Sequence, residues 1–356
     1  MNDLDYGNAR LAVRRSRLLT GDRLVGLLDL GFEGLVAALS DSPLGPDLRE
    51  ALLRFEGLRM IQEALRRHLG RSLTDAVSFY EGEARRDLEL LASRWDLQNL
   101  VTLLRGQARR VAPDELVSLM IPTATLDEAA LRELAEAPGL RAAIERMVVW
   151  GLPSPSGARR LLEAWRDYER HDDVARLEHR LVELAAQALD TAMHDHHLDD
   201  VLARPLRLAV DLRQLMTALR LFDAFSQGDI ASVSGPHRFA DLPGGYLDSA
   251  ALRAAIERPN LEEAVAALTT AAADHPFLPF LHQLLDHRSL ERLHAELEAW
   301  ILTDTVARAR HADPLSLAVP VGYVFAKEAE HRNLRLVAAA VTGRLDRTEA
   351  LSHLIH

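Results

Sequence analysis

The amino-acid sequence predicts an all-α protein, and three observations support this prediction. Apolar residues make up 48% of the 356 residues but aromatic residues only 5%, so leucine and alanine dominate the apolar set. Leucine, alanine, arginine and glutamate lose little side-chain freedom on a helix, which makes them strong helix formers. Apolar residues also recur at spacings of three and four over long segments, which is typical of helices that bury one face.

The first predicted element is a basic amphipathic helix in residues 9–19, "ARLAVRRSRLL". A helix of this kind can lie on a membrane surface or bind a partner. We favour an ordinary helix of a bundle, in which Leu11, Val13 and Leu18 face partly inward while the arginines face water.

Three long amphipathic helices are predicted further along the chain, and capping pairs mark other helix starts. The long segments are residues 55–69, 177–193 and 290–306. A capping pair places a Thr, Asn or Asp three residues before an acidic residue. The pairs are Thr125 with Glu128, Asn260 with Glu263, and Asp346 with Glu349.

Clusters of proline and glycine predict the breaks between helices. They occupy residues 40–47, 151–157 and 226–245. The last cluster contains Gly244 and Gly245, which we expect to form a tight turn into the next helix, since glycine tolerates backbone conformations that other residues avoid. No phosphate-binding Lys-Ser or Lys-Thr pair follows these glycines.

A short polar frame recurs three times on predicted helices. Each copy has an acidic residue followed three positions later by an amide, in residues 94–105, 209–220 and 326–340. The pairs are Asp96 with Asn99, Asp211 with Gln214, and Glu330 with Asn333; Arg105, Arg220 and Arg335 follow within these segments. The acidic residues are 115 and 119 positions apart, which predicts a repeated small domain. We expect three helical units, at residues 1–115, 116–238 and 239–356.

The recurrence favours a structural role over catalysis, because three separate catalytic copies are unusual in one chain. Residues three apart lie on one face of a helix. We therefore expect each acid and amide to satisfy buried backbone groups where a neighbouring helix ends.

The third copy lies within "KEAEHRNLR", residues 327–335, which contains the only lysine of the chain. Alone, this stretch resembles a catalytic cluster around Lys327 and Glu328. Beside the other copies it is interpreted as a structural frame, and we expect an ion pair within the bundle at Lys327.

Composition excludes several classes of function. The formal net charge of −11 argues against a nucleic-acid partner, which usually requires a basic surface. The chain has no cysteine, which removes disulfides, thiolate metal sites and cysteine nucleophiles and fits a cytoplasmic protein best. The sequence lacks the usual nucleotide-binding, serine-hydrolase and zinc-protease motifs. We expect no catalytic, cofactor-binding or metal-binding residues.

The sequence predicts no segment that spans a membrane and no signal peptide. The best membrane candidate, residues 315–326, is much shorter than the roughly 20 apolar residues that a spanning helix needs.

One histidine-rich stretch supports an alternative. "MHDHHLDD", residues 193–200, and the pair His171 and Asp172 resemble the ligands of metal-dependent helical phosphohydrolases. His194 and His197 share one helical face in this interpretation. We favour a solvated helix end, because histidine is favourable near the negative end of a helix.

The order and spacing of these motifs resemble the C subunit of the A/V-type rotary ATPases, the relative of the d subunit in eukaryotic V-type ATPases. The resemblance covers nearly the whole chain. It is carried by residues 6–19, "YGNARLAVRRSRLL", residues 79–108 with their Asp, Asn and Leu-Arg frame, "LPGGYL" at 242–247, and residues 323–345. Gln214 departs from the asparagine usual in the second copy, and His331 replaces an aliphatic residue.

The resemblance implies a funnel of three similar helical units without an active site or a cofactor. It implies a central-stalk spacer that links the shaft of the soluble ATPase head to the membrane proteolipid ring, on the cytoplasmic face of the plasma membrane. Rotation would then couple proton or sodium transport to ATP synthesis or hydrolysis. A metal-dependent phosphohydrolase and a generic helical adaptor remain alternatives.

Overall fold

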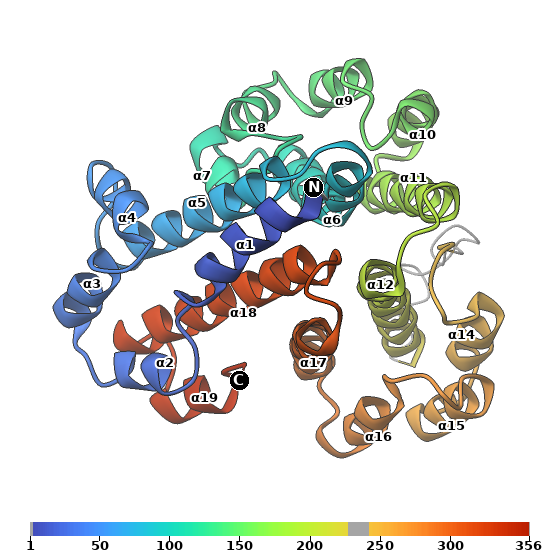
Figure 1. Cartoon of the computed structure of the whole chain (residues 1–356). Helices are drawn as coiled ribbons and strands as arrows, with labels where there is room; N and C mark the ends of the chain where they lie inside the picture. Colours follow the sequence, from blue (N-terminus) through green and yellow to red (C-terminus); the bar gives the residue numbers. More distant parts are fainter. Residues whose placement is uncertain (1–2, 227–241, 356) are drawn as a thin grey trace. The chain divides into compact units, whose positions relative to one another are not determined.

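The computed structural model describes residues 3–226 and 242–355, and all regular elements in these residues are helices (Figure 1). The helices of the first third are α1 (Asp3–Arg15), α2 (Asp22–Leu27), α3 (Phe32–Ser40), α4 (Gly45–Leu52), α5 (Gly57–Ser78), α6 (Gly82–Ala108), α7 (Pro113–Ser118) and α8 (Glu128–Ala135). The next are α9 (Leu140–Val149), α10 (Pro155–His171), α11 (Val174–Asp195) and α12 (Asp200–Ser226). The last are α14 (Ser249–Ile256), α15 (Leu261–Ala271), α16 (Leu278–His287), α17 (Leu290–His311), α18 (Ala318–Val341) and α19 (Arg347–Ser352). The all-α prediction is confirmed for the described residues.

The chain forms two compact units. The N/C unit comprises Met1–Ala137 and Leu302–His356, and the middle unit comprises Pro138–Ile301. In the N/C unit α18 packs along α5 and against α1, so the two ends of the chain meet in one core (Figure 1). In the middle unit successive helices pack on one another, with α10 between α9 and α11, and α14 between α12 and α15.

The core of the N/C unit is built from leucines and other aliphatic residues at helical spacing. Leu35, Leu48, Ile61 and Val337 are completely buried and belong to one cluster contributed by α3, α4, α5 and α18. Burying an aliphatic side chain of this size contributes about 1.5–3 kcal/mol to stability. Distant segments of the chain are therefore fastened together mainly by apolar contacts.

The basic segment at residues 9–19 divides between α1 and the turn that follows Arg15. Leu11 and Leu18 are buried as predicted. The prediction for Val13 was wrong, because its side chain is 54% exposed. In α1 the buried stripe follows Leu11, and a position two residues away points to a different side of the helix.

The predicted helix starts are correct at two positions of three. Asn260 accepts a hydrogen bond from the backbone of Glu263 and caps α15, and Asp346 caps α19. The third was wrong: Asp127, not Thr125, accepts from Ala130 N–H and caps α8. Of the breaks, residues 151–157 join α9 to α10 and residues 40–47 lead from α3 into α4. Most of the break at residues 226–245 lies outside the described residues.

Candidate functional site

The first acid–amide pair lies in the middle of α6 and is buried. The side chain of Asn99 binds both backbone groups of Ile121, because its Nδ2 donates to the carbonyl at 2.6 Å and its Oδ1 accepts from the N–H at 2.9 Å. Asp96 accepts a hydrogen bond from the hydroxyl of Thr123. The backbone N–H of Leu126 donates to that same hydroxyl at 2.9 Å. The pair thus fastens the loop between α7 and α8 onto α6.

The third pair lies on α18 and repeats this geometry. Asn333 donates to the carbonyl of Ile355 at 2.8 Å and accepts from its N–H at 2.8 Å. The clamped residue follows the asparagine by 22 positions in both copies. Glu330 accepts from the backbone N–H of Leu19 at 2.7 Å, so this copy holds two distant segments against α18.

The second pair lies on α12 in the middle unit, and here the acid makes most of the contacts. Asp211 accepts from the backbone N–H groups of Tyr246 and Leu247, each at 2.9 Å. It also contacts Nε2 of His275 at 3.0 Å. Phe277 N–H donates to Nδ1 of His275, which leaves Nε2 to carry the proton toward Asp211. Gln214 donates to the carbonyl of Leu242, but its buried Oε1 has no hydrogen-bond partner among the described residues.

Gly244 and Gly245 lie where the chain returns onto Asp211. Gly244 has a φ of 94°, a conformation that favours glycine. A Cβ on Gly245 would lie 2.2 Å from Oδ1 of Asp211, so only a glycine lets the backbone approach this closely. The predicted turn is present, and α14 begins at Ser249.

Lys327 is 4% exposed and forms an ion pair with Glu330 one turn further along α18. A second buried group lies close by, in which His68 Nδ1 contacts Asp47 Oδ2 at 2.9 Å and Arg71 also pairs with Asp47. Burial lowers the pKa of Lys327 from its ordinary value, although Glu330 and Asp47 oppose the change. Burial also lowers the pKa of His68, and the charge of Lys327 adds to that effect.

His331, beside this network, has a buried Nδ1 atom that finds no hydrogen-bond partner in residues 3–226 and 242–355. Burial and the positive charges of Arg335 and Lys327 lower the pKa of His331 to about 3. The imidazole is therefore neutral at physiological pH, although a hydrogen bond with the backbone of Leu65 opposes this shift.

Glu328 points to another helix of the N/C unit. It forms an ion pair with Arg94 of α6, whose guanidinium lies 4.0 Å from the ring centre of Trp95 and 4.4 Å from that of Phe325. Cation–π contacts of this kind contribute about 0.5–2 kcal/mol. The arginines that follow the three frames, Arg105, Arg220 and Arg335, are exposed.

Sequence reasoning did not identify the partners of the frames. Ile121, Leu19 and Ile355 take part through their backbone, which has no residue signature. His275 is separated by 64 positions from Asp211, and no local pattern links the two.

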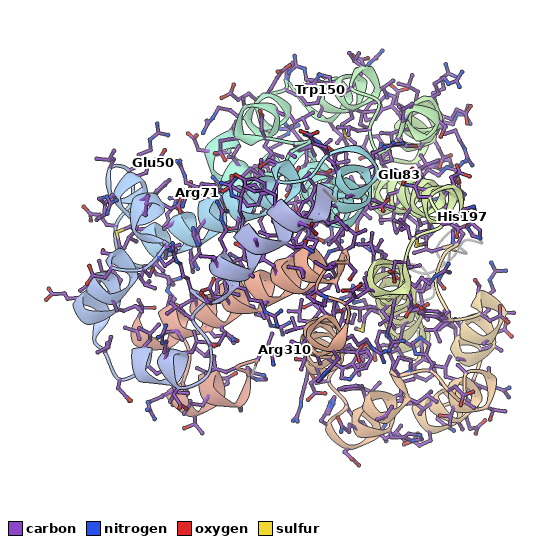
Figure 2. All side chains as sticks on the ribbon, viewed as in Figure 1. Glu50, Arg71, Glu83, Trp150, His197 and Arg310 are labelled. Atoms are coloured by element: carbon purple, nitrogen blue, oxygen red, sulfur yellow. The ribbon has the colours of Figure 1, made fainter. Side chains whose placement is uncertain are left out.

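The histidine-rich stretch lies at helix ends. His171 and His194 contact backbone carbonyls one turn earlier, of Asp167 and Asp190, and both are exposed. His197 is also exposed and is labelled in Figure 2. Within residues 3–226 and 242–355, no three or more histidine or acidic side chains are grouped to hold one metal ion. Among the helices of these residues, none combines the length and apolar character that a membrane crossing requires.

The raised pKa of Asp96 gives a pH-dependent prediction. Burial raises the pKa of this carboxyl from 3.8 to about 6. The folded protein therefore keeps a proton where the unfolded chain has lost it, and this contribution to stability disappears as pH rises through about 6. We expect the difference in unfolding free energy between Asp96→Asn and the unmodified chain to change with pH. From about pH 4 to about pH 7.5 it should shift by about 2 kcal/mol in favour of Asp96→Asn, as measured by urea denaturation.

Asp41→Asn, at an exposed aspartate, is the control and should show no such gain. A stability difference between Asp96→Asn and the unmodified chain that stays constant over this pH range would contradict the prediction.

Comparisons with known proteins match this chain to the C subunits of ATP synthases. The family model for the ATP synthase (C/AC39) subunit matches residues 7–352. The V-type ATP synthase C subunit of Thermus thermophilus is 30% identical over 356 residues, covering 99% of each chain. The V-type ATP synthase C subunit of Deinococcus radiodurans is 26% identical over 286 residues, 76% of each chain. The A-type ATP synthase C subunit of Halorubrum lacusprofundi is 24% identical over 355 residues, 99% of this chain and 97% of the relative.

Proposed function

Since the chain belongs to the ATP synthase (C/AC39) subunit family, we propose that it is the non-catalytic central-rotor spacer of a V/A-type ATPase. In this role it links the central shaft of the soluble head to the proteolipid ring. It transmits the rotation that couples proton or sodium transport to ATP synthesis or hydrolysis. As part of this complex, the chain lies on the cytoplasmic face of the plasma membrane.

The observation that carries this proposal is the extent of the family match. It covers residues 7–352, so one family accounts for nearly the whole chain. The relative in Thermus thermophilus, a C subunit of a V-type ATP synthase, aligns over 99% of both chains.

The three acid–amide frames support a division into three helical units, at residues 1–115, 116–238 and 239–356. The frames lie on α6, α12 and α18, and the asparagines of the first and third clamp a residue 22 positions further on. We assign them a structural role and propose a funnel of three pseudo-symmetric units that receives the end of the shaft.

The buried clamps also fit a mechanical task. A part that transmits torque must keep its shape under load, and close-packed helices have low compressibility. Charge-assisted hydrogen bonds such as those of Asp211 and Glu330 are stronger than neutral ones and tie loops to the long helices. The frames therefore stiffen the three units.

Co-purification tests this proposal. An affinity-tagged chain, expressed in its own cell, is expected to retain both shaft and proteolipid subunits. The acidic chain, with its net charge of −11, should hold a basic shaft end less tightly as salt rises. Recovery of neither subunit would contradict the proposal, and recovery of unrelated proteins alone would favour a generic adaptor.

A further inference from the structure

The N/C unit contains a charged cavity that the proposed function does not use. Its volume is about 310 Å3, within the range of about 300–1,000 Å3 that small-molecule sites occupy. Five arginines and three carboxylates line it, together with Phe55, Val117 and Ser118. The charged residues are Arg54, Arg59, Arg66, Arg67, Arg132, Glu63, Asp114 and Glu128.

One guanidinium in the lining is buried and held rigidly. Arg66 is 4% exposed and donates to Glu63 at 2.8 Å, to Glu128 at 3.0 Å and to the carbonyl of Met120 at 2.9 Å. These carboxylates raise the pKa of Arg66, so its charge is permanent. The cavity therefore has a cationic group that is positioned before any ligand arrives.

Two more arginines are already paired. Arg67 forms ion pairs with Glu63 and with Glu50, which is labelled in Figure 2. Arg132 donates to Asp114 at 2.8 Å. Their charges are balanced within the protein.

Arg54 and Arg59 have no such balance. Both are exposed, and among the described residues no carboxylate lies within ion-pair distance of either. The guanidinium of Arg59 lies 4.9 Å from the ring centre of Phe55, which holds it over one wall of the cavity. The hydrogen bond from Arg132 lowers the pKa of Asp114, and the charges of Arg54 and Arg59 add to this effect.

We propose that this cavity binds a small anion that carries a phosphate group. The two unbalanced arginines supply two positive charges, and a phosphate monoester carries about −1.5 to −2 at neutral pH. The planar guanidinium donates two parallel hydrogen bonds that match phosphate oxygens. The phosphate would be held by Arg54 and Arg59, next to the fixed charge of Arg66.

Titration calorimetry with inorganic pyrophosphate at low salt tests the proposal on the full chain. We expect saturable binding of one anion. Arg54→Gln with Arg59→Gln should weaken it at least about tenfold, since each charged hydrogen bond contributes substantially to affinity. Both side chains are exposed, so the fold is retained.

Arg23→Gln with Arg109→Gln is the matched control, because it removes the same charge from exposed arginines outside the lining set. It should change the affinity by less than about twofold. The proposal is overturned if pyrophosphate does not bind saturably, or if the two double variants lose affinity equally.

A second experiment distinguishes a lipid headgroup from a free phosphate compound. The exposed Leu53 and Leu119 adjoin the lining residues Arg54 and Ser118 in the chain, a placement that suits contact with lipid. Phosphatidylcholine vesicles with added phosphatidic acid therefore serve as the alternative probe. Vesicle binding that requires Arg54 and Arg59, found together with pyrophosphate binding, assigns a lipid headgroup, and binding of pyrophosphate alone assigns a free phosphate compound; both support the site.

Discussion

Replacing Asp211 by alanine is expected to lower the free energy of unfolding of the middle unit by about 3–5 kcal/mol. Asp211 is completely buried, and its carboxylate accepts from the N–H groups of Tyr246 and Leu247 and from His275. The substitution leaves the buried His275 and the partly buried N–H groups of Tyr246 and Leu247 without this acceptor. Removing one partner in this way costs about 1–3 kcal/mol for each buried group.

Hydrogen exchange gives this prediction a local measurement. The amides of Tyr246 and Leu247 should lose protection in Asp211→Ala, while those of α5 in the N/C unit keep it. Asp223→Ala removes an exposed aspartate from the same helix and should change stability by no more than about 0.5 kcal/mol. Unchanged protection at residues 246 and 247 would show that the carboxylate does not hold this segment.

Replacing Lys327 by alanine is expected to lower the stability of the N/C unit by about 3–5 kcal/mol and to reduce assembly into the ATPase. Among the residues that the structure describes, the substitution removes this ion pair and leaves the N–H of Leu19 as a hydrogen-bond donor to the buried carboxylate of Glu330. It also removes the favourable charge interaction between Lys327 and Asp47. An unpaired buried charge is costly because the interior solvates it poorly.

A second variant separates the ion pair from the packing of its side chains. Lys327→Met with Glu330→Gln replaces both charges by side chains of similar size, and should regain more than half of the lost stability. Arg335→Ala, at an exposed position of the same helix, should change stability by no more than about 0.5 kcal/mol. Urea denaturation measures all three. A free energy of unfolding for Lys327→Ala within about 1 kcal/mol of that of the unmodified chain would show that the lysine does not stabilise the N/C unit in this way.

The sequence was sufficient for the helical fold and for the location of the polar frames. Leucine spacing predicts which face of a helix is buried, and residues three apart on α6 and α18 share that face, so Asn99 and Asn333 were found from local pattern. The resemblance to the ATPase family rested on the same frames together with their order.

The partners of the frames were beyond sequence reasoning. Asn99 and Asn333 bind backbone groups, and any residue other than proline at positions 121 and 355 offers the same N–H and C=O. The environment of Lys327 depends on α4 and α5 packing near α18, which is a tertiary event. The helix start at Asp127 was missed because Thr125 with Glu128 fits the same capping pattern.

The departure at Gln214 also has a local physical consequence. Its longer side chain donates to the carbonyl of Leu242, but within the described part of the chain Oε1 has no hydrogen-bond partner. An asparagine in the first and third frames satisfies both backbone groups of one residue. The middle frame relies instead on Asp211 and His275, which explains why Asp211 is expected to be the most sensitive position there.

We propose that this chain connects the shaft to the proteolipid ring. The most direct measurement immobilises the purified shaft subunits and asks whether detergent-solubilised proteolipid ring is retained. We predict retention of the ring only when this chain is present, in proportion to the amount of chain bound. Retention of the ring without the chain, or binding of the chain to the shaft without any capture of the ring, would contradict the claim.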